Sequence, residues 1–286
     1  MWIILAFLTA ICEAVKDALC KKSLKDFDVF TIAWAWKFFS LPFILPLIFF
    51  VPIPEYLPGL FWLALVAGGG LNILATLLYI RAINQSDLSI TLPLLSFTPV
   101  FLLFTSPVMV GDVPTLPGYA GVLLIFSGSY LLGIKDRSTL LSPLKAIVRE
   151  PGARTMLLVA LIWSVAANMD KLGVMSTSPF FWAVCVQSFI SAGLCIVLWF
   201  NRSALRGRTG NSLKMLLLIG FFTAAGFIFQ MIAIKLGLVP YVIAIKRTSI
   251  IMGVLVGGLY FMEKDLKTRL VAAGVMLAGV FLIAVS

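Results

Sequence analysis

The sequence predicts an all-α integral membrane protein whose ten transmembrane helices form two inverted five-helix repeats. Of the 286 residues, 61% are hydrophobic and 12% are charged, whereas soluble domains are roughly 45–50% apolar and 25% charged. The apolar residues fall into ten segments, each long enough to cross a bilayer. The two halves of the chain also carry similar motifs at a nearly constant spacing.

Short connectors separate most of the predicted spans. The spans cover residues 2–20, 29–51, 58–83, 88–110, 116–134, 155–175, 178–200, 213–236, 239–261 and 267–285. No short apolar region with a small-residue cleavage site precedes the first of them, so we interpret it as a retained span rather than a removed signal. The longest connector predicts three parts: a first five-helix repeat at 1–134, a basic cytoplasmic connector at 135–154, and a second five-helix repeat at 155–286. A short surface helix is expected at 138–148.

The distribution of lysine and arginine predicts the orientation in the membrane. Most of the lysine and arginine residues outside the spans lie in alternate connectors, on one side of the membrane. The opposite side holds only Lys171 and Lys235, both at span ends. Because positively charged connectors stay in the cytoplasm, we expect both termini outside. This bias also accounts for the net charge of +10 without a nucleic-acid partner. We expect a multi-pass protein of the plasma or inner membrane, surrounded by lipid, as a monomer or homodimer.

Composition argues against several kinds of enzyme. The chain contains no histidine, which is the commonest general base and metal ligand. Its cysteines all lie in apolar segments, without zinc or redox spacing, and are expected to be small buried hydrophobic residues. They are Cys12, Cys20, Cys185 and Cys195. We therefore predict no catalytic residue, no metal site and no cofactor.

The two halves resemble each other weakly. Asp17 in LTAICEAVKDAL matches Asp170 in LIWSVAANMDKL at an offset of 153 residues, and Gly128 matches Gly279 at an offset of 151. An odd number of spans in each half turns the second copy upside down. Inverted repeats of this kind are typical of secondary transporters.

The ends of the two halves carry a more specific signature, VMVGDVPTLPGYAGVLLIFSGSYLL and GGLYFMEKDLKTRLVAAGVMLAGVFLI. Both resemble the EamA-like family of drug/metabolite transporters, in which an acidic residue after the fourth helix of each repeat precedes a glycine-spaced fifth helix. The matching residues are Asp112, Gly121, Gly128, Glu263 and Gly279. Asp112 replaces the usual glutamate, and Ala272 stands where glycine is frequent. The resemblance implies ten helices and small-molecule transport, and leaves the substrate open.

A first charged cluster lies on the first span. Glu13, Lys16 and Asp17 share one helical face, because residues three and four apart are neighbours on a helix. Glu13 should lie ~10 Å below the cytoplasmic surface and Lys37 ~12 Å below it, which predicts a Glu13–Lys37 pair. This pair could be purely structural, or it could form an inner gate or a site that binds substrate and protons.

A second charged cluster combines Asp170 with Lys246 and Arg247. Both cations lie inside the span 239–261, where each costs roughly 2.5–3.5 kcal/mol if it faces lipid. We therefore expect them to face the protein interior. Adjacent residues on a helix point ~100° apart, so Arg247 is expected to pair with Asp170 near the outer face, and Lys246 to contact a ligand. Structural pairing alone is the alternative.

Polar and aromatic side chains are expected to line a cavity between the two clusters. The candidates are Gln187, Gln230, Trp34, Trp163, Asn72, Ser96 and Tyr241. Each could instead be an interhelical hydrogen-bonding group or an interfacial aromatic residue. Pro93 and Pro99 should kink the fourth span, as is common in helices that line cavities. The glycines 68–70 and 257–258 are expected to form close-packing surfaces.

The interior charges favour a negatively charged ligand group, since the deep cations outnumber the deep carboxylates. The sequence therefore predicts a secondary active transporter of a small polar metabolite, anionic or zwitterionic, working by alternating access. Proton coupling through Glu13 and Asp170 is a further hypothesis. The alternative is a flippase or carrier of an anionic lipid-linked headgroup, whose cations would open sideways to lipid. A membrane-embedded enzyme would need converging acid/base or metal groups, and a scaffold or receptor would not need interior charges.

Overall fold

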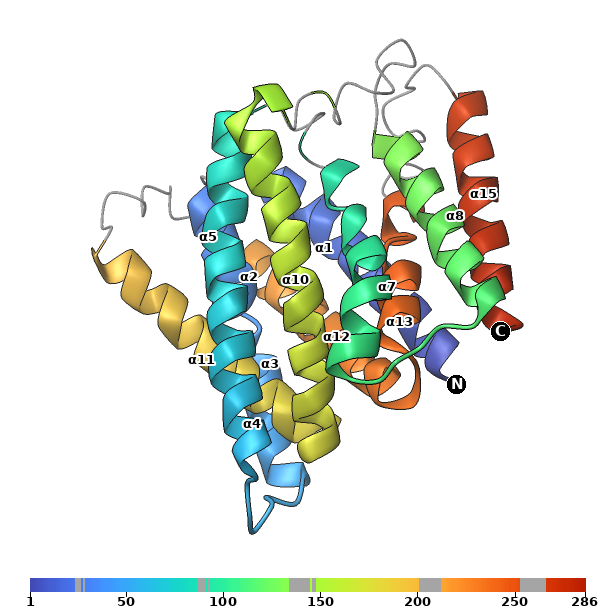
Figure 1. Cartoon of the computed structure of the whole chain (residues 1–286). Coiled ribbons are helices and arrows are strands. Elements are labelled where there is room, and N and C mark those ends of the chain that lie inside the picture. The colour runs from blue at the N-terminus through green and yellow to red at the C-terminus, as the bar shows by residue number, and fades with distance from the viewer. Residues whose placement is uncertain are drawn as a thin grey trace.

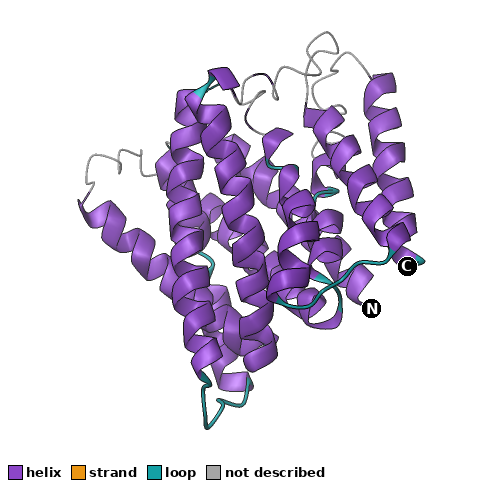
Figure 2. Cartoon of the chain, viewed as in Figure 1, coloured by secondary structure: helices purple, strands orange, loops and turns teal. Residues whose placement is uncertain are grey.

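The computed structural model is a bundle of helices (Figure 1). It describes residues 1–23, 27, 29–86, 91, 93–133, 145, 148–200, 212–252 and 266–286, and every regular element in these ranges is helical (Figure 2). The surface helix expected at 138–148 lies outside the described residues, apart from Lys145 and Val148. Glu263, Gly257 and Gly258 also lie outside them.

Helices occur at every predicted span. The first half contains α1 (Trp2–Ser23), α2 (Val29–Phe38), α3 (Leu41–Ile44), η1 (Leu45–Phe50), α4 (Gly59–Leu63), η2 (Ala64–Gly68), α5 (Gly69–Gln85), α7 (Phe97–Met109) and α8 (Leu116–Gly133). The second half contains α10 (Pro151–Ser176), α11 (Pro179–Phe200), α12 (Ser212–Leu236), α13 (Val239–Lys246) and α15 (Leu266–Ala284). Within the described residues, 5 helical stretches are long and apolar enough to cross a membrane by themselves.

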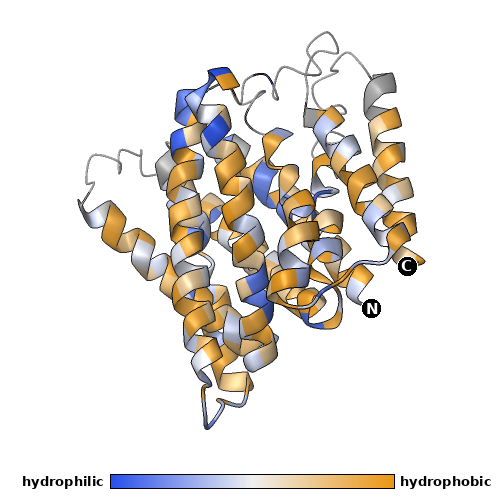
Figure 3. Cartoon of the chain, viewed as in Figure 1, coloured by the Kyte–Doolittle hydropathy of each residue, from blue (hydrophilic) through white to orange (hydrophobic). Residues whose placement is uncertain are grey.

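The outer surface of the bundle suits a lipid environment. Hydrophobic residues occupy most of the helix length in Figure 3, and large apolar side chains such as Phe104, Val108 and Phe281 are exposed. Helices satisfy their own backbone hydrogen bonds, which is what a chain surrounded by hydrocarbon requires. The charged residues described below lie inside this apolar surface.

The two halves pack against each other with their roles exchanged. α1 packs on α12, and its counterpart α10 packs on α5, the counterpart of α12, while the two fifth helices α8 and α15 pair with each other. In Figure 1 α1 rises from the end where both termini lie, whereas α10 descends toward that end. The fold is therefore the predicted pair of inverted five-helix repeats.

Glycines bring α8 and α15 into close contact at one side of the bundle. A Cβ atom added at Gly121 would lie 2.6 Å from the carbonyl oxygen of Gly279, and one added at Gly279 would lie 2.6 Å from that of Gly121. A Cβ at Gly128 would lie 2.6 Å from the carbonyl oxygen of Ala272. The fifth helices therefore brace the outside of the bundle, as the sequence predicts, and the glycines permit backbone contact.

The glycines at the start of α5 behave differently from one another. A Cβ at Gly68 would lie 2.7 Å from the side chain of Met169, and one at Gly69 would lie 2.4 Å from that of Phe189. Close packing is thus confirmed for these two. At Gly70 a Cβ would meet nothing within 4 Å, so the prediction is wrong there, because this glycine points away from its neighbours.

The fourth span of the first repeat is interrupted. Residues 93 and 94 are helical, a turn follows at residues 95–96, and α7 begins at Phe97. Pro93 and Pro99 flank this break, and neither can donate a backbone hydrogen bond. The predicted disruption of this span is confirmed.

The fourth span of the second repeat is interrupted at the matching position. α13 ends at Lys246, a turn follows at residues 247–248, and the helix resumes at Ser249. The sequence predicts an unbroken span there, and that prediction is wrong. Proline does not cause this break, and the turn instead coincides with the two buried cations. Interrupted helices at equivalent positions of two inverted repeats mark the binding region in many transporters.

Candidate binding cavity

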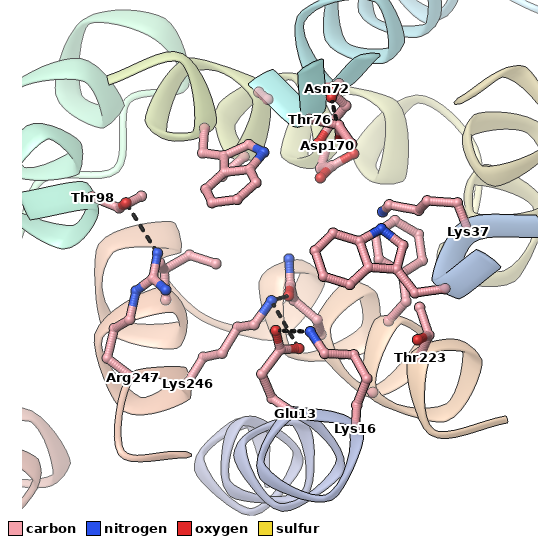
Figure 4. Close-up of a pocket in the computed structure, with 18 residues that line it drawn as sticks. Glu13, Lys16, Lys37, Asn72, Thr76, Thr98, Asp170, Thr223, Lys246 and Arg247 are labelled. Carbon is pink, nitrogen blue, oxygen red and sulfur yellow. Dashed lines mark hydrogen bonds and ion pairs between the residues drawn. The ribbon is translucent and has the colours of Figure 1, made fainter. Parts of the chain in front are cut away.

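A cavity of about 160 Å³ lies where helices of both repeats converge (Figure 4). The first repeat lines it from α1, α2, α5 and α7, and the second from α10, α12 and the end of α13. Its charged lining residues are Glu13, Lys16, Lys37, Asp170, Lys246 and Arg247, and its polar and aromatic ones include Trp36, Asn72, Thr76, Thr98, Trp163, Thr223 and Gln230. The two charged clusters predicted at opposite faces therefore meet around one cavity.

Helical spacing explains how α10 and α12 contribute their side chains. Trp163, Ala167 and Asp170 on α10 all line the cavity, and their spacing of four and then three residues places them on one face. Thr223, Phe227 and Gln230 on α12 repeat the same spacing and also line it. Each helix thus presents a mixed polar and aromatic stripe to the cavity.

Glu13 forms ion pairs with two lysines, neither of which is Lys37. Lys16 pairs with Glu13 and lies 3.2 Å from Asp17, while the ammonium of Lys246 lies 3.5 Å from the other oxygen of Glu13. The predicted Glu13–Lys37 pair is therefore wrong. Lys16 is a local partner on the same helical face, and α1 packs directly on α13, which brings Lys246 to Glu13. Depth in the membrane could not distinguish these partners.

Lys37 instead faces neutral groups. Its ammonium donates a hydrogen bond to Gln187 Oε1 at 3.3 Å and lies 5.7 Å from the ring centre of Phe227. Gln187 is fully buried behind Lys37 and donates in turn to the hydroxyl of Ser40. Gln187 is predicted to line the cavity, but it is not among the lining residues and instead supports Lys37 from behind.

Asp170 and Arg247 also have partners other than the predicted ones. Trp182 Nε1 donates to Asp170 at 3.0 Å, and Arg247 donates to the hydroxyl of Thr98 at 3.0 Å. The predicted Asp170–Arg247 pair is wrong. Arg247 keeps helical backbone angles, φ −66° and ψ −14°, so the two adjacent cations still point in different directions, Lys246 toward Glu13 and Arg247 toward Thr98. Both cations reach the cavity, and it is Lys246 that is paired with a carboxylate.

Gln230 and Trp163 line the cavity as expected, and Gln230 accepts a hydrogen bond from Lys246 at 2.9 Å. Trp34 does not line it: its ring stacks on Phe38 with centroids 4.7 Å apart. Its neighbour Trp36 forms the wall, with the ammonium of Lys16 4.8 Å from its ring centre.

Three further candidates lie away from the cavity. The side chain of Asp17 is 60% exposed, so it reaches the site only through Lys16. The hydroxyl of Tyr241 accepts a hydrogen bond from the backbone of Thr115, and Ser96 binds Ser129. These contacts hold helices together, which is the alternative that the sequence left open for Tyr241 and Ser96.

Several lining residues are missing from the candidates that the sequence suggests. For Thr76 a signal existed, since it follows the candidate Asn72 by one helical turn. Thr98 directly follows the proline-associated break. Trp36 and Thr223 carry no such signal, because α2 and α12 are apolar around most of their circumference and their inward faces cannot be identified from periodicity.

Asp112, the acidic residue of the signature motif in the first repeat, joins the two repeats near the end of the bundle where both termini lie. Its carboxylate accepts a hydrogen bond from the backbone nitrogen of Val239 at 2.8 Å and lies 3.6 Å from the ammonium of Lys171. Lys171 also donates to the backbone oxygens of Ile234 and Gly237. Asp112 therefore stabilises the start of α13, and Lys171 ties the end of α12 to α10.

Comparison with known proteins identifies the family. The model of the EamA-like transporter family matches residues 1–134 and 151–285. A protein of Archaeoglobus fulgidus (strain ATCC 49558 / DSM 4304 / JCM 9628 / NBRC 100126 / VC-16) named "Uncharacterized transporter" is 25% identical, over 98% of this chain and 94% of its own length. A protein of known crystal structure shares the fold, with a TM-score of 0.78 and 14% identity, over 99% of this chain and 96% of its own. The chain belongs to the EamA-like transporter family and is an integral, multi-pass membrane transport protein rather than an enzyme.

Proposed function

We propose that this protein is a secondary active transporter that moves a small anionic or zwitterionic metabolite by alternating access across the plasma or inner membrane. The supporting observation is the charge of the cavity, which is lined by four cations and only two carboxylates among the described residues. An excess of buried positive charge is costly unless an anion accompanies it. The cavity, at about 160 Å³, is also smaller than the roughly 300–1,000 Å³ typical of pockets for drug-sized ligands, which favours a small metabolite.

The arrangement of the repeats supports alternating access. Each repeat supplies one interrupted helix to the cavity, so a ligand held at the breaks would touch both repeats at once. The Glu13–Lys246 contact joins α1 to α13 across the same cavity. A ligand anion that attracts Lys246 would weaken this contact, which links binding to a rearrangement between the repeats.

A ligand screen tests this function. We expect purified protein to be thermally stabilised by members of a panel of amino acids, sugar phosphates, nucleobases and organic acids, and the stabilising compounds should carry an acidic group. The shift should be smaller in Lys246→Ala, because Glu13 and Asp17 then keep only Lys16 as an ion-pair partner among the described residues, and their uncompensated negative charge opposes an anion in the cavity. Stabilisation only by cationic or uncharged compounds would contradict the proposal, and stabilisation only by anionic lipid headgroups would favour the lipid-linked carrier instead.

Proton coupling is proposed as part of the same mechanism. Asp170 is the better candidate, since Glu13 is already bound by two lysines, whereas no ion pair involves Asp170 within the described part of the chain. In proteoliposomes, transport should lose its dependence on a pH gradient in Asp170→Asn or Glu13→Gln. Unchanged coupling in both variants would exclude protons as the driving ion through these groups.

A further inference from the structure

The charged residues around the cavity divide into a paired set and an unpaired set. The paired set consists of Lys16 and Lys246 with Glu13 and Asp17, joined by contacts of up to 3.5 Å. It contains two cations and two carboxylates, so its charges cancel. The paired set therefore leaves no net charge for a ligand to neutralise.

The unpaired set consists of Arg247, Lys37 and Asp170. Among the described residues, neither cation lies within 4.0 Å of a carboxylate oxygen, and Asp170 lies within that distance of no lysine or arginine nitrogen. Their hydrogen-bond partners are the neutral groups of Thr98, Gln187 and Trp182. The net positive charge of the site therefore resides on this set.

Arg247 has capacity for a further acceptor. One terminal nitrogen donates to Thr98, while Nε is buried without a partner among the described residues. A guanidinium presents several donors in a planar fork that matches a carboxylate or phosphate group. Because Nε is buried, an oxyanion in the cavity would be met by the terminal nitrogens of Arg247, where it would neutralise the guanidinium.

The three unpaired groups lie on different walls of the cavity. In Figure 4 Arg247 and Lys37 extend into it from opposite sides, and Asp170 approaches from a third. Because the two cations approach from opposite sides (Figure 4), a short molecule with an acid group at each end can present one acid group to each of them. The carboxylate of Asp170 then requires a positively charged group on the same molecule.

Resting on the proposed function, we propose that the substrate is a small acidic zwitterion with two acid groups and one ammonium group. Arg247 and Lys37 bind the two acid groups, and Asp170 binds the ammonium. The net charge of such a ligand, −1, balances that of the unpaired set. Its small size agrees with the cavity, whose volume of about 160 Å³ lies below the roughly 300–1,000 Å³ of pockets that hold drug-sized ligands.

Three probes with the same carbon skeleton test this assignment by titration calorimetry on the purified full-length protein. L-glutamate carries all three charges, L-glutamine lacks the second acid group, and glutarate lacks the ammonium. We expect glutamate to bind about tenfold or more tightly than either, because each missing partner leaves a charged group unsatisfied. L-aspartate, L-asparagine and succinate form a shorter matched set, in case the cavity prefers that length.

Variants assign the groups. One of Arg247→Gln and Lys37→Gln, at the cation that faces the side-chain acid group, should abolish the preference for glutamate over glutamine, whereas the other should weaken both ligands alike. Asp170→Asn should abolish the preference for glutamate over glutarate. Each ratio compares two ligands on one variant, so partial loss of folded protein does not change it. Lys235→Gln and Glu55→Gln alter exposed charges outside the cavity and should retain both preferences.

The outcomes separate this proposal from the general function. Equal binding of glutamate and glutamine would contradict the proposal that the substrate carries a second acid group. Equal binding of glutamate and glutarate would contradict the proposal that Asp170 binds an ammonium group. If neither matched set binds while the broader panel yields another anion, this substrate class is wrong and the transport proposal stands. If no anionic or zwitterionic compound of the broader panel binds, both proposals fail.

Discussion

Arg247 donates a hydrogen bond to Thr98 at 3.0 Å; Arg247 lies in the turn that interrupts its helix, and Thr98 lies in the first turn of α7, just after the break in the first repeat. This contact spans the pseudo-symmetric interface at the cavity wall. It holds the guanidinium without neutralising it, because threonine carries no charge. Arg247 therefore remains available to an anion.

Removing the hydroxyl of Thr98 should weaken ligand binding by affecting the orientation of Arg247. For Thr98→Val we expect a loss of about 0.5–1.5 kcal/mol in binding free energy, the range for one hydrogen bond. Thermal stability should also fall, because the variant removes the bond to the backbone oxygen of Leu95 and the acceptor for Arg247. Titration of the stabilising ligand measures the effect. Thr155→Val is the matched control, because Thr155 is exposed and bonds only to its own helix in the described structure. Equal losses in both variants would contradict this role.

The Glu13–Lys246 contact should be energetically coupled across the two repeats. In Glu13→Gln, Lys16 and Lys246 lose a shared carboxylate, so we expect lower thermal stability. Adding Lys246→Gln removes one of the two repelling cations and should recover part of the loss. The coupling expected from a double-mutant cycle is about 1–3 kcal/mol, less than for a fully buried pair because the Glu13 side chain is 28% exposed. Additive effects would show that the contact contributes nothing.

The packing of the fifth helices provides a test of stability that is independent of the ligand. In Gly279→Ala the new methyl group would meet the carbonyl oxygen of Gly121 at 2.6 Å, so α8 and α15 must move apart. We expect a loss of about 1–3 kcal/mol from overpacking. Gly274→Ala on the same helix meets nothing within 4 Å and should leave the melting temperature unchanged or slightly raised. Similar melting temperatures for the two variants would contradict the close contact.

The sequence predicts the architecture far better than the ion pairs. Apolar segments of membrane-spanning length locate the ten spans, and glycine spacing marks the fifth helix of each repeat, because both follow from the one-dimensional pattern. The pairing of Glu13 depends on which helices are neighbours in the bundle. Depth places Lys37 and Lys246 equally well beside it, and only the packing of α1 on α13 selects Lys246.

The break at residues 247–248 carries no local signal, since no proline or glycine accompanies it. The roles expected for Lys246 and Arg247 are exchanged because the packing of α1 on α13 brings Lys246, and not Arg247, to a carboxylate. The matching break in the first repeat, with Pro93 and Pro99 beside it, was the available signal, because inverted repeats tend to interrupt corresponding helices. Comparison of the two halves at that position would have indicated it.

The most direct test of the cavity as the transport site is an experimental structure with a stabilising ligand bound. The account predicts that an acid group of this ligand lies within hydrogen-bonding distance of Arg247 or Lys37, between the two interrupted helices. A ligand bound elsewhere on the protein, with no contact to either cation, would contradict it.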